Sequence, residues 1–379
     1  MRLDRTQCPG LVRNIVYKSL QACRAAAALS VVLFHLGTQL ALGKTFGIAW
    51  FGELFRFGRA GVDFFFVLSG FIVVTAHQSD FFQPARLFAY LRKRVTRIYP
   101  IYWFIFVTTA CLAMTMPSTR AALPHDTPLI VKSLALVPQD PTVVGGTGAP
   151  VIVTAWTLQY ELVFYAIVGL FIFGRVTAAL VVVAMLANSL LCMDVCRFPS
   201  EFFASPYFLL FGLGAAIAFV CRAAPRMRHA RVVAALGGIA FALTAVIETA
   251  TRAPLGSHVS IIAYGLSSAA VIFGLVKAED VGQVVGGHRW TQLLGDASYS
   301  LYLLHFPVLS VLCKIALASG LHGLRGALVT FGFVLIGCVA SGVCLHVWVE
   351  RPVLRLLRRF SSSRRAVHSR KVSGAEAES

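Results

Sequence analysis

A histidine stands inside an apolar run near the start of the chain. In the stretch SVVLFHL, His35 follows Arg24 by eleven residues. Eleven residues are close to three turns of an α-helix, so both side chains project from one helix face, about 16 Å apart along its axis. Imidazole exchanges protons near neutral pH and serves as a general base or a nucleophile in group transfer. His35 is therefore a candidate catalytic residue; the alternative is a structural histidine bonded to a neighbouring helix.

A second apolar stretch, GVDFFFVLSGF, carries Asp63 near its start and Ser69 further along. A carboxylate beside an imidazole fixes the tautomer of the ring and orients it, as in many hydrolytic and transfer sites. Asp63 is thus a candidate orienting partner for His35. The alternative is a carboxylate at a helix N-terminus that the helix dipole stabilises.

Aromatic residues surround a third candidate in the stretch TAWTLQYELVFYA. Trp156 and Tyr160 precede Glu161, and together they indicate a polar cavity that binds a sugar by stacking and hydrogen bonding. Two other interpretations stay open. Trp156 also suits the aromatic belt at a membrane surface, and Glu161 also suits an ion pair with Arg24 or His35.

A basic stretch, ARLFAYLRKRVTRIYPIYW, has five Lys or Arg residues within twelve positions. Arg94 and Arg97 are three apart and share a helix face, where guanidinium groups suit a ligand rich in phosphate. The alternative is the ordinary positive charge of a cytoplasmic loop. Pro100, in the same stretch, is expected to break the helix that follows.

His305, in SYSLYLLHFPV, lies two residues before Pro307, which frees a backbone carbonyl nearby. A structural hydrogen bond and a role in a transfer pathway are both open for this histidine.

The composition places these residues in a membrane protein. Of the 379 residues, 58% are hydrophobic and only 13% charged, and the mean hydropathy is +0.76, against about 45–50% and about 25% in soluble chains. The net charge of +18 is clustered between apolar runs, which favours cytoplasmic loops over a nucleic-acid surface. The cysteines show no metal-site spacing, and the pair Cys192 and Cys196 is by itself too weak a signal for a disulfide.

Ten runs are long and apolar enough to cross a bilayer, for which about 20 residues are needed. They are 20–41, 60–77, 98–116, 153–173, 176–193, 204–222, 231–248, 258–276, 297–318 and 326–349. An even number puts both termini on one side. With that side cytoplasmic, 24 Lys and Arg residues fall inside and 8 outside, which is the bias that sets membrane orientation.

This topology predicts the depth of the candidate residues. Asp63 is expected just inside the outer surface, with Ser69 deeper. His35 and Glu161 lie about six and eight residues from the outer ends of their spans, so they reach similar depth if the two helices pack together.

Six of these stretches, taken in order, resemble the motifs of the acyltransferase-3 family, bacterial inner-membrane proteins that O-acylate polysaccharides, lipid-linked glycans and some small molecules. They are RAAAALSVVLFH, GVDFFFVLSGF, RVTRIYPIYW, WTLQYELVFY, SYSLYLLHFP and WVERPVLR. The resemblance covers nearly the whole chain. The form WTLQYE is more similar to the exopolysaccharide and O-antigen members than to the macrolide-modifying branch.

The resemblance implies an acyl donor, an acceptor and a set of residues. The donor is cytosolic acyl-coenzyme A, acetyl-CoA above all, and no further cofactor or metal is implied. The acceptor is a hydroxyl of a cell-surface or exported glycan or a lipid-linked sugar. The catalytic candidates are His35, Asp63 and Glu161; the donor-binding candidates are Arg24, Arg94 and Arg97; other motif positions are Ser69, Trp156, Tyr160 and His305.

We therefore expect an all-α polytopic bundle of about ten transmembrane helices, with both termini cytoplasmic. Residues 1–350 form the membrane acyltransferase domain, and 351–379 a basic, disordered cytoplasmic tail. The expected partners are acyl-CoA, the glycan acceptor, membrane lipid and the polysaccharide synthesis and export machinery, and no nucleic acid. In this reading His35 acts as general base or accepts the acyl group itself, with the thioester beside it. The rival classes are a transporter or flippase of a lipid-linked sugar and a membrane scaffold.

Overall fold

The computed structural model describes residues 17–115, 123–124, 126–192, 196–252, 254 and 256–359. In these residues the only regular secondary structure is helical. Ten helical segments are long and apolar enough to cross a membrane, which confirms the all-α fold and the ten predicted spans. The predicted cytoplasmic tail lies partly outside the described residues, at 360–379, whereas 351–359 continue the last helix.

The ten long helices are α1 (Lys18–Ala41), α3 (Gly61–His77), α4 (Leu87–Met114), α8 (Trp156–Phe173), α9 (Arg175–Cys192), α11 (Tyr207–Ala223), α12 (Ala230–Ala250), α13 (His258–Glu279), α14 (Arg289–Ala318) and α15 (Gly323–Leu345). Short helices are α2 (Ala49–Leu54), α6 (Thr127–Leu134), α7 (Pro141–Val144) and α10 (Ser200–Ala204). Short 3₁₀ segments include η1 (Arg56–Ala60), η2 (Gln78–Asp80) and η4 (Val153–Ala155), and a π-helical turn, η5 (His346–Glu350), continues α15.

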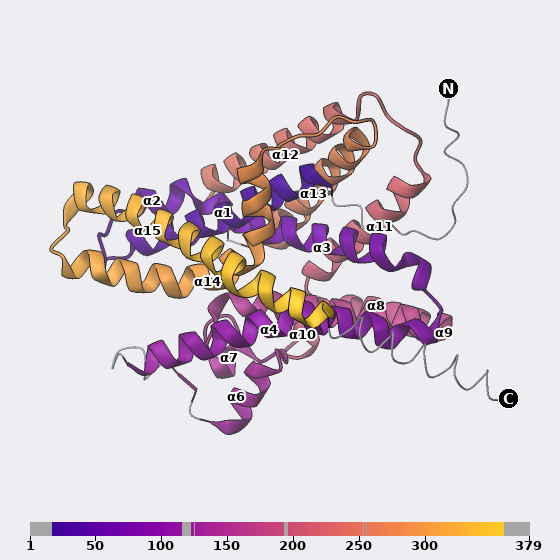
Figure 1. Ribbon diagram of the computed structural model, residues 1–379, viewed down its shortest axis with the longest axis horizontal. Coiled ribbons are helices and arrows are strands. Elements are labelled where there is room, and N and C mark those ends of the chain that lie inside the picture. The colour runs from indigo at the N-terminus through magenta and orange to yellow at the C-terminus, as the bar shows by residue number, and fades with distance from the viewer. Residues whose placement is uncertain are drawn as a thin grey trace.

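The helices form two groups in Figure 1, with α1–α3 and α11–α15 above and α4–α10 below. The helix pairs in closest association lie within the groups, such as α1 with α14, α3 with α11, and α8 with α9. Where the groups join, α8 contacts α3 and α11, and α14 contacts α4 and η4. A shared apolar core that includes Phe66, Phe164 and Phe211 packs there. In the lower group, a disulfide joins Cys192 to Cys196.

Helix α1 lies at the centre of the upper group, and its first turn is capped by a carboxylate from a helix that is distant along the chain. The backbone N–H groups of Lys18 and Ser19 donate to the two carboxylate oxygens of Glu279, at 2.8 and 2.9 Å. The first N–H groups of a helix lack partners within the helix, and an anion there is stabilised by the helix dipole. Glu279 thus fixes the start of α1 against the end of α13, and with it the position of the face that carries Arg24.

The second span differs from its predicted bounds. It begins at Ala49 rather than at residue 60, as α2 and η1 lead into α3. At Gly58 a side chain is excluded, because a Cβ would lie 2.1 Å from the Ser30 carbonyl oxygen. Since Ser30 is at the middle of α1, Asp63 lies level with the middle of that helix. Asp63 therefore does not lie near the end of its span, as expected, because α2 and η1 precede it in the same span.

The third span also starts earlier than expected. Helix α4 begins at Leu87 and contains the basic stretch from that residue on, whereas Arg86 lies in the preceding 3₁₀ segment, η3 (Pro84–Arg86). Pro100 lies within α4 without ending it. A proline inside a helix removes one backbone hydrogen bond, and α4 tolerates this loss. Arg94 and Arg97 are consequently held on a rigid helix rather than on a loop.

Candidate functional site

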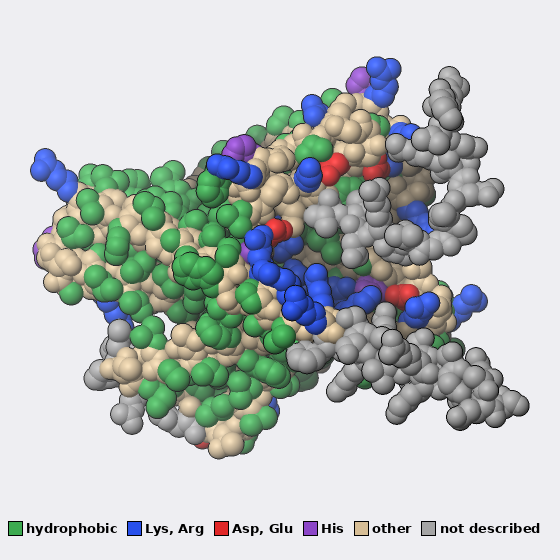
Figure 2. Space-filling view, in the orientation of Figure 1, with side chains coloured by type: hydrophobic (Ala, Val, Ile, Leu, Met, Phe, Trp, Pro, Cys, Tyr) green, Lys and Arg blue, Asp and Glu red, His purple; other side chains and the backbone are tan. Residues whose placement is uncertain are grey.

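A cavity of about 950 Å³ lies where the two groups of helices meet. The residues of α3 and η2 that line it include Gln78 at one end and Phe65 towards the other. Arg94, which contacts His77, therefore marks one end and Phe65 with Tyr302 the other, while Arg222 and Arg358 also line the cavity. We call the first the basic end. In Figure 2, Lys and Arg side chains gather in the hollow between the upper and lower groups. The cavity thus runs from a cationic opening towards an aromatic end. We call the second the inner end, because it lies deeper in the protein.

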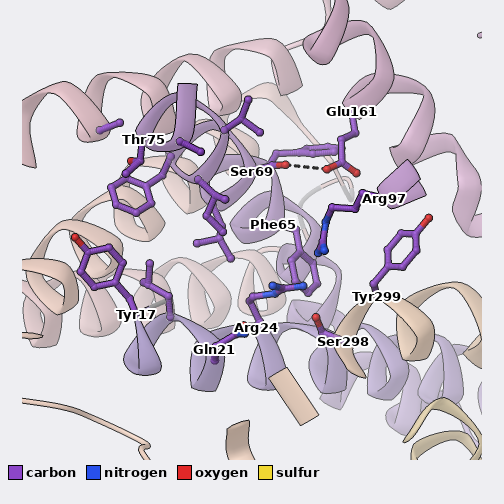
Figure 3. Close-up of a pocket in the computed structure, with 18 of the residues that line it drawn as sticks. Tyr17, Gln21, Arg24, Phe65, Ser69, Thr75, Arg97, Glu161, Ser298 and Tyr299 are labelled. Carbon is purple, nitrogen blue, oxygen red and sulfur yellow. Dashed lines mark hydrogen bonds between the residues drawn. The ribbon is translucent and has the colours of Figure 1, made fainter. Parts of the chain in front are cut away.

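The three arginines predicted to bind the donor, Arg24, Arg94 and Arg97, all line this cavity. Arg24 comes from α1 in the upper group, while Arg94 and Arg97 come from α4 in the lower group. Figure 3 shows the side chains of Arg24 and Arg97 directed into the same space. Among the described residues, five arginines line the cavity against two carboxylates, Glu161 and Asp280. An excess of guanidinium groups suits an anionic ligand that supplies the missing negative charge.

Glu161 lines the same cavity, and hydroxyl groups hold its carboxylate. Ser69 on α3 donates its hydroxyl to Oε1 of Glu161 at 2.9 Å (Figure 3), and Tyr165, one turn along α8, donates to the same oxygen at 2.5 Å. The predicted motif residues Ser69 and Glu161 are thus direct partners. An ion pair of Glu161 with Arg24 or His35 was the open alternative, and the carboxylate is instead hydrogen-bonded to two hydroxyls.

Arg94 has a partner that the sequence analysis missed. Its Nη2 lies 2.8 Å from Nε2 of His77, and Nδ1 of His77 lies 2.8 Å from Oδ2 of Asp80. The guanidinium also lies over the rings of Tyr90 and Tyr165, at 5.6 and 5.4 Å from their centroids. The sequence signal was available, since His77 and Asp80 are three residues apart at the end of an apolar run.

His35 lies next to a second histidine. The ring centroids of His35 and His305 are 5.3 Å apart, and Phe306 packs edge-on against His35 at 5.3 Å. His305 is completely buried, and its Nδ1 lies 2.7 Å from the carbonyl oxygen of Tyr302. A carbonyl only accepts hydrogen bonds, so Nδ1 carries the proton and Nε2 keeps a lone pair. That Nε2 is buried and has no hydrogen-bond partner.

The histidine pair is not among the described residues that line the cavity. Two aromatic side chains lie between the histidine pair and the cavity. Phe65 and Tyr302 line the inner end of the cavity, with ring centroids 6.0 Å apart, and the ring of Tyr302 is 5.9 Å from that of His305. The expectation that a thioester in the cavity lies directly beside His35 therefore does not match this conformation, because Tyr302 and Phe65 close the inner end.

Asp63 lies in a different charged cluster from the one expected. Its carboxylate is 3.6 Å from Arg59, four residues earlier, and Arg59 is 4.0 Å from Glu248 of α12. Tyr264 donates its hydroxyl to Glu248 at 2.8 Å. The structure thus sets Asp63 against Arg59, whereas the ring beside His35 is that of His305. The expected pairing of Asp63 with His35 needs correction, because η1 brings Arg59 onto the same face as Asp63.

Trp156 and Tyr160 belong to an aromatic cluster at the start of α8. The ring of Tyr160 stacks on Phe202 with centroids 4.1 Å apart, and Trp156 lies 5.3 Å from Tyr207 and 6.2 Å from Phe66. Neither residue is among those described as lining the cavity. Their rings pack against other rings, and the sugar-binding role stays a prediction.

Two arginines of the cavity, Arg222 and Arg358, were counted only as cytoplasmic loop charge. Arg222 lies in the last turn of α11, and Arg358 lies in the helical segment after η5. No local pattern distinguishes them from the other loop arginines, so only the fold reveals them. Among the residues described, no three His, Cys, Asp or Glu side chains gather closely enough to hold a metal ion.

Comparison with known proteins identifies the class. The profile of the acyltransferase-3 family, described as an acyltransferase domain, matches residues 17–347. The chain belongs to this family and is an enzyme that transfers acyl groups. The matched region contains every predicted site residue, whereas Arg358 lies beyond it.

Two curated relatives are similar along most of their length. The exopolysaccharide production protein ExoZ of Rhizobium meliloti (strain 1021) is 31% identical, over 80% of this chain and 92% of ExoZ. The acyltransferase MdmB of Streptomyces mycarofaciens is 25% identical, over 92% of this chain and 94% of MdmB. No solved structure is significantly similar to the chain.

Proposed function

We propose that this membrane acyltransferase moves an acyl group from acyl-coenzyme A to a hydroxyl of an exported glycan, and that the acyl group is acetyl. The observation that carries the proposal is the cavity whose arginines Arg24, Arg94 and Arg97 converge from two groups of helices. Coenzyme A bears phosphates, which guanidinium groups bind through charge-assisted and bidentate hydrogen bonds. Its long pantetheine arm suits the path from the basic end to the aromatic inner end.

The basic end faces the cytosol in this proposal. The excess of Lys and Arg in the segments on that side supports the orientation, since such an excess marks cytoplasmic loops. Both termini are then cytoplasmic, and the membrane is the inner membrane of a bacterium. The donor enters from the cytosol, and the glycan reaches the histidine pair from the opposite side.

His35 acts as the general base in the mechanism that we favour. The acceptor hydroxyl oxygen attacks the thioester carbonyl carbon while His35 takes the hydroxyl proton. The new C–O bond forms, the C–S bond breaks, and the coenzyme A thiolate recovers the proton from the imidazolium. His305 keeps a lone pair on Nε2, and it takes the orienting role that we had expected of Asp63.

Phe65 and Tyr302 separate the donor cavity from the histidine pair, and the proposal gives them the role of a partition. Their rings turn aside when donor and acceptor are both bound, so that the thioester reaches His35. In the closed arrangement the partition keeps water on the acceptor side away from the thioester. Excluding water from a reactive group prevents its wasteful hydrolysis.

Glu161 and Asp63 support the site rather than perform the proton transfer. Glu161, held by Ser69 and Tyr165, supplies negative charge near the converging arginines and keeps their side chains in the cavity. Asp63 and Arg59 neutralise each other's buried charge beside α1. Both assignments stay proposals.

The acceptor class rests on the relatives. ExoZ is named as an exopolysaccharide production protein, which supports a polysaccharide or its lipid-linked precursor, and the associated synthesis and export machinery as a partner. The test is transfer of label from radiolabelled acetyl-CoA to glycan in membranes with and without the chain. Label in the glycan only when the chain is present supports the proposal, and equal labelling contradicts it.

A further inference from the structure

A chain of hydrogen bonds leads from Asp80 through His77 to Arg94 at the basic end. The three residues come from three different elements: His77 is the last residue of α3, Asp80 lies in η2, and Arg94 lies on α4. Both links are 2.8 Å long. The chain therefore connects the guanidinium of a cavity-lining arginine to a carboxylate that does not line that cavity.

The chemistry of the two ends fixes the protonation of the imidazole between them. Arginine has no acceptor, so Nη2 of Arg94 donates and Nε2 of His77 accepts. Asp80 then receives the hydrogen bond from Nδ1–H. His77 is thus a neutral imidazole with one defined tautomer, and Asp80 is the group that selects this tautomer.

The surroundings hold this arrangement in place. His77 is only 2% exposed, and its ring packs edge-on against Tyr90 at 4.9 Å. The guanidinium of Arg94 lies over Tyr90 on one side and near Tyr165 on the other. Arg94 is therefore fixed by a hydrogen bond and by two rings before any ligand arrives, with its other N–H groups left for the cavity.

We propose that His77 and Asp80 are positioning residues that fix Arg94 for the donor phosphates and make donor binding sensitive to cytosolic pH. This inference rests on the proposed function. A long side chain loses rotamer freedom when it binds a ligand, and fixing it beforehand removes that cost. Protonation of Nε2 replaces its lone pair by an N–H, which faces the cationic guanidinium and breaks the link to Arg94.

Several charged or titratable groups face His77 and shape this response. Asp80 and Arg94 contact the ring directly, and Lys93 lies beside it. A cavity of about 240 Å³ beside the ring is lined also by Arg86 and Tyr90. The cations Arg94, Lys93 and Arg86 outnumber the single carboxylate, so a proton added to the ring places a further positive charge among them and releases Arg94.

The test measures acetyl-CoA affinity by calorimetric titration of the full-length protein in lipid nanodiscs. His77→Phe keeps a ring against Tyr90 but removes both nitrogens, and it raises the dissociation constant about tenfold, near the lower end for a hydrogen bond to a charged group. His77→Gln keeps an uncharged acceptor and an uncharged donor. It retains most of the affinity but loses the pH dependence that the wild type shows between about pH 8 and pH 5, where imidazole titrates.

A double-mutant cycle with Arg94→Ala separates positioning from folding. If His77 acts through Arg94, His77→Phe adds nothing to the loss caused by Arg94→Ala. His229→Phe, an exposed histidine elsewhere, is the matched control and leaves donor affinity unchanged. Equal and additive losses in both backgrounds, or normal affinity in His77→Phe, overturn the inference. A wild type that does not bind acetyl-CoA contradicts the proposed function itself, and a wild type that binds it independently of pH contradicts the pH response.

Discussion

His305 offers a prediction in which stability and rate separate. Its imidazole makes two distinct contributions, since Nδ1–H donates to the Tyr302 carbonyl at 2.7 Å and Nε2 keeps a lone pair beside His35. His305→Leu removes both, and the loss of the hydrogen bond to the Tyr302 carbonyl costs about 0.5–1.5 kcal/mol of stability. His305→Asn places an amide N–H near the position of Nδ1 and removes the acceptor near Nε2.

The expected outcomes of the two variants therefore differ. His305→Asn retains near-normal stability, while the transfer rate falls about 10–100-fold, the usual effect of removing a group that orients an active-site imidazole. His305→Leu loses a comparable rate and also thermal stability. The assay pairs the midpoint of thermal unfolding in detergent with the initial rate of acetyl transfer per folded molecule. It includes a pH–rate profile, because loss of the orienting partner also moves the limb that reports the base.

A normal rate in folded His305→Asn would refute the argument that His305 orients His35. So would a rate loss that disappears once the amount of folded protein is corrected for. In either case the lone pair on Nε2 has no part in transfer, and the 2.7 Å bond to Tyr302 is purely structural.

Three further predictions concern the donor, the packing and the topology. Arg97→Ala weakens acetyl-CoA binding by about 1.5–3 kcal/mol, the range for hydrogen bonds to charged groups, and Lys restores only part because it lacks the planar fork; unchanged affinity limits Arg97 to loop charge. Gly70→Ala lowers the amount of folded protein, because its Cβ would lie 2.2 Å from a carbonyl oxygen of α11, whereas Gly212→Ala, with open space, does not; equal amounts contradict this packing. A reporter active only in the periplasm works when inserted at 145–146 and fails at 82–86, and the reverse pattern inverts the donor and acceptor sides.

The number of spans was predictable because each requires a long apolar run, which hydropathy reveals directly. The bounds of the second span were not. Glu53, Arg56 and Arg59 interrupt the apolar pattern there, yet α2 and η1 still pack on α1 through Phe51 and Gly58. Close contact at a glycine depends on the partner helix, which a single sequence does not specify.

The site was predictable only in part, because a single sequence does not specify which helices are neighbours. The motif resemblance grouped Arg24, Arg94 and Arg97 as donor-binding residues. The structure places all three around one cavity, and their role in donor binding stays a prediction. The contact of His35 with His305 depends on which helices are neighbours in the bundle, and periodicity carries no such information. The pairing of Asp63 with Arg59, by contrast, was open to prediction, since residues four apart on a helical stretch face each other.

The role of His35 as the base of acyl transfer can be tested with one substitution. His35→Gln keeps a hydrogen-bonding side chain of similar size that takes no proton near neutral pH. Membranes with equal amounts of wild type, His35→Gln and the exposed control His322→Gln receive labelled acetyl-CoA, and both glycan label and donor affinity are measured. We expect His35→Gln to bind donor normally and to transfer about 10²–10⁴-fold more slowly, the usual effect of losing a general base, while His322→Gln matches the wild type. A His35→Gln variant that retains most of the transfer contradicts the account and points to a base other than His35.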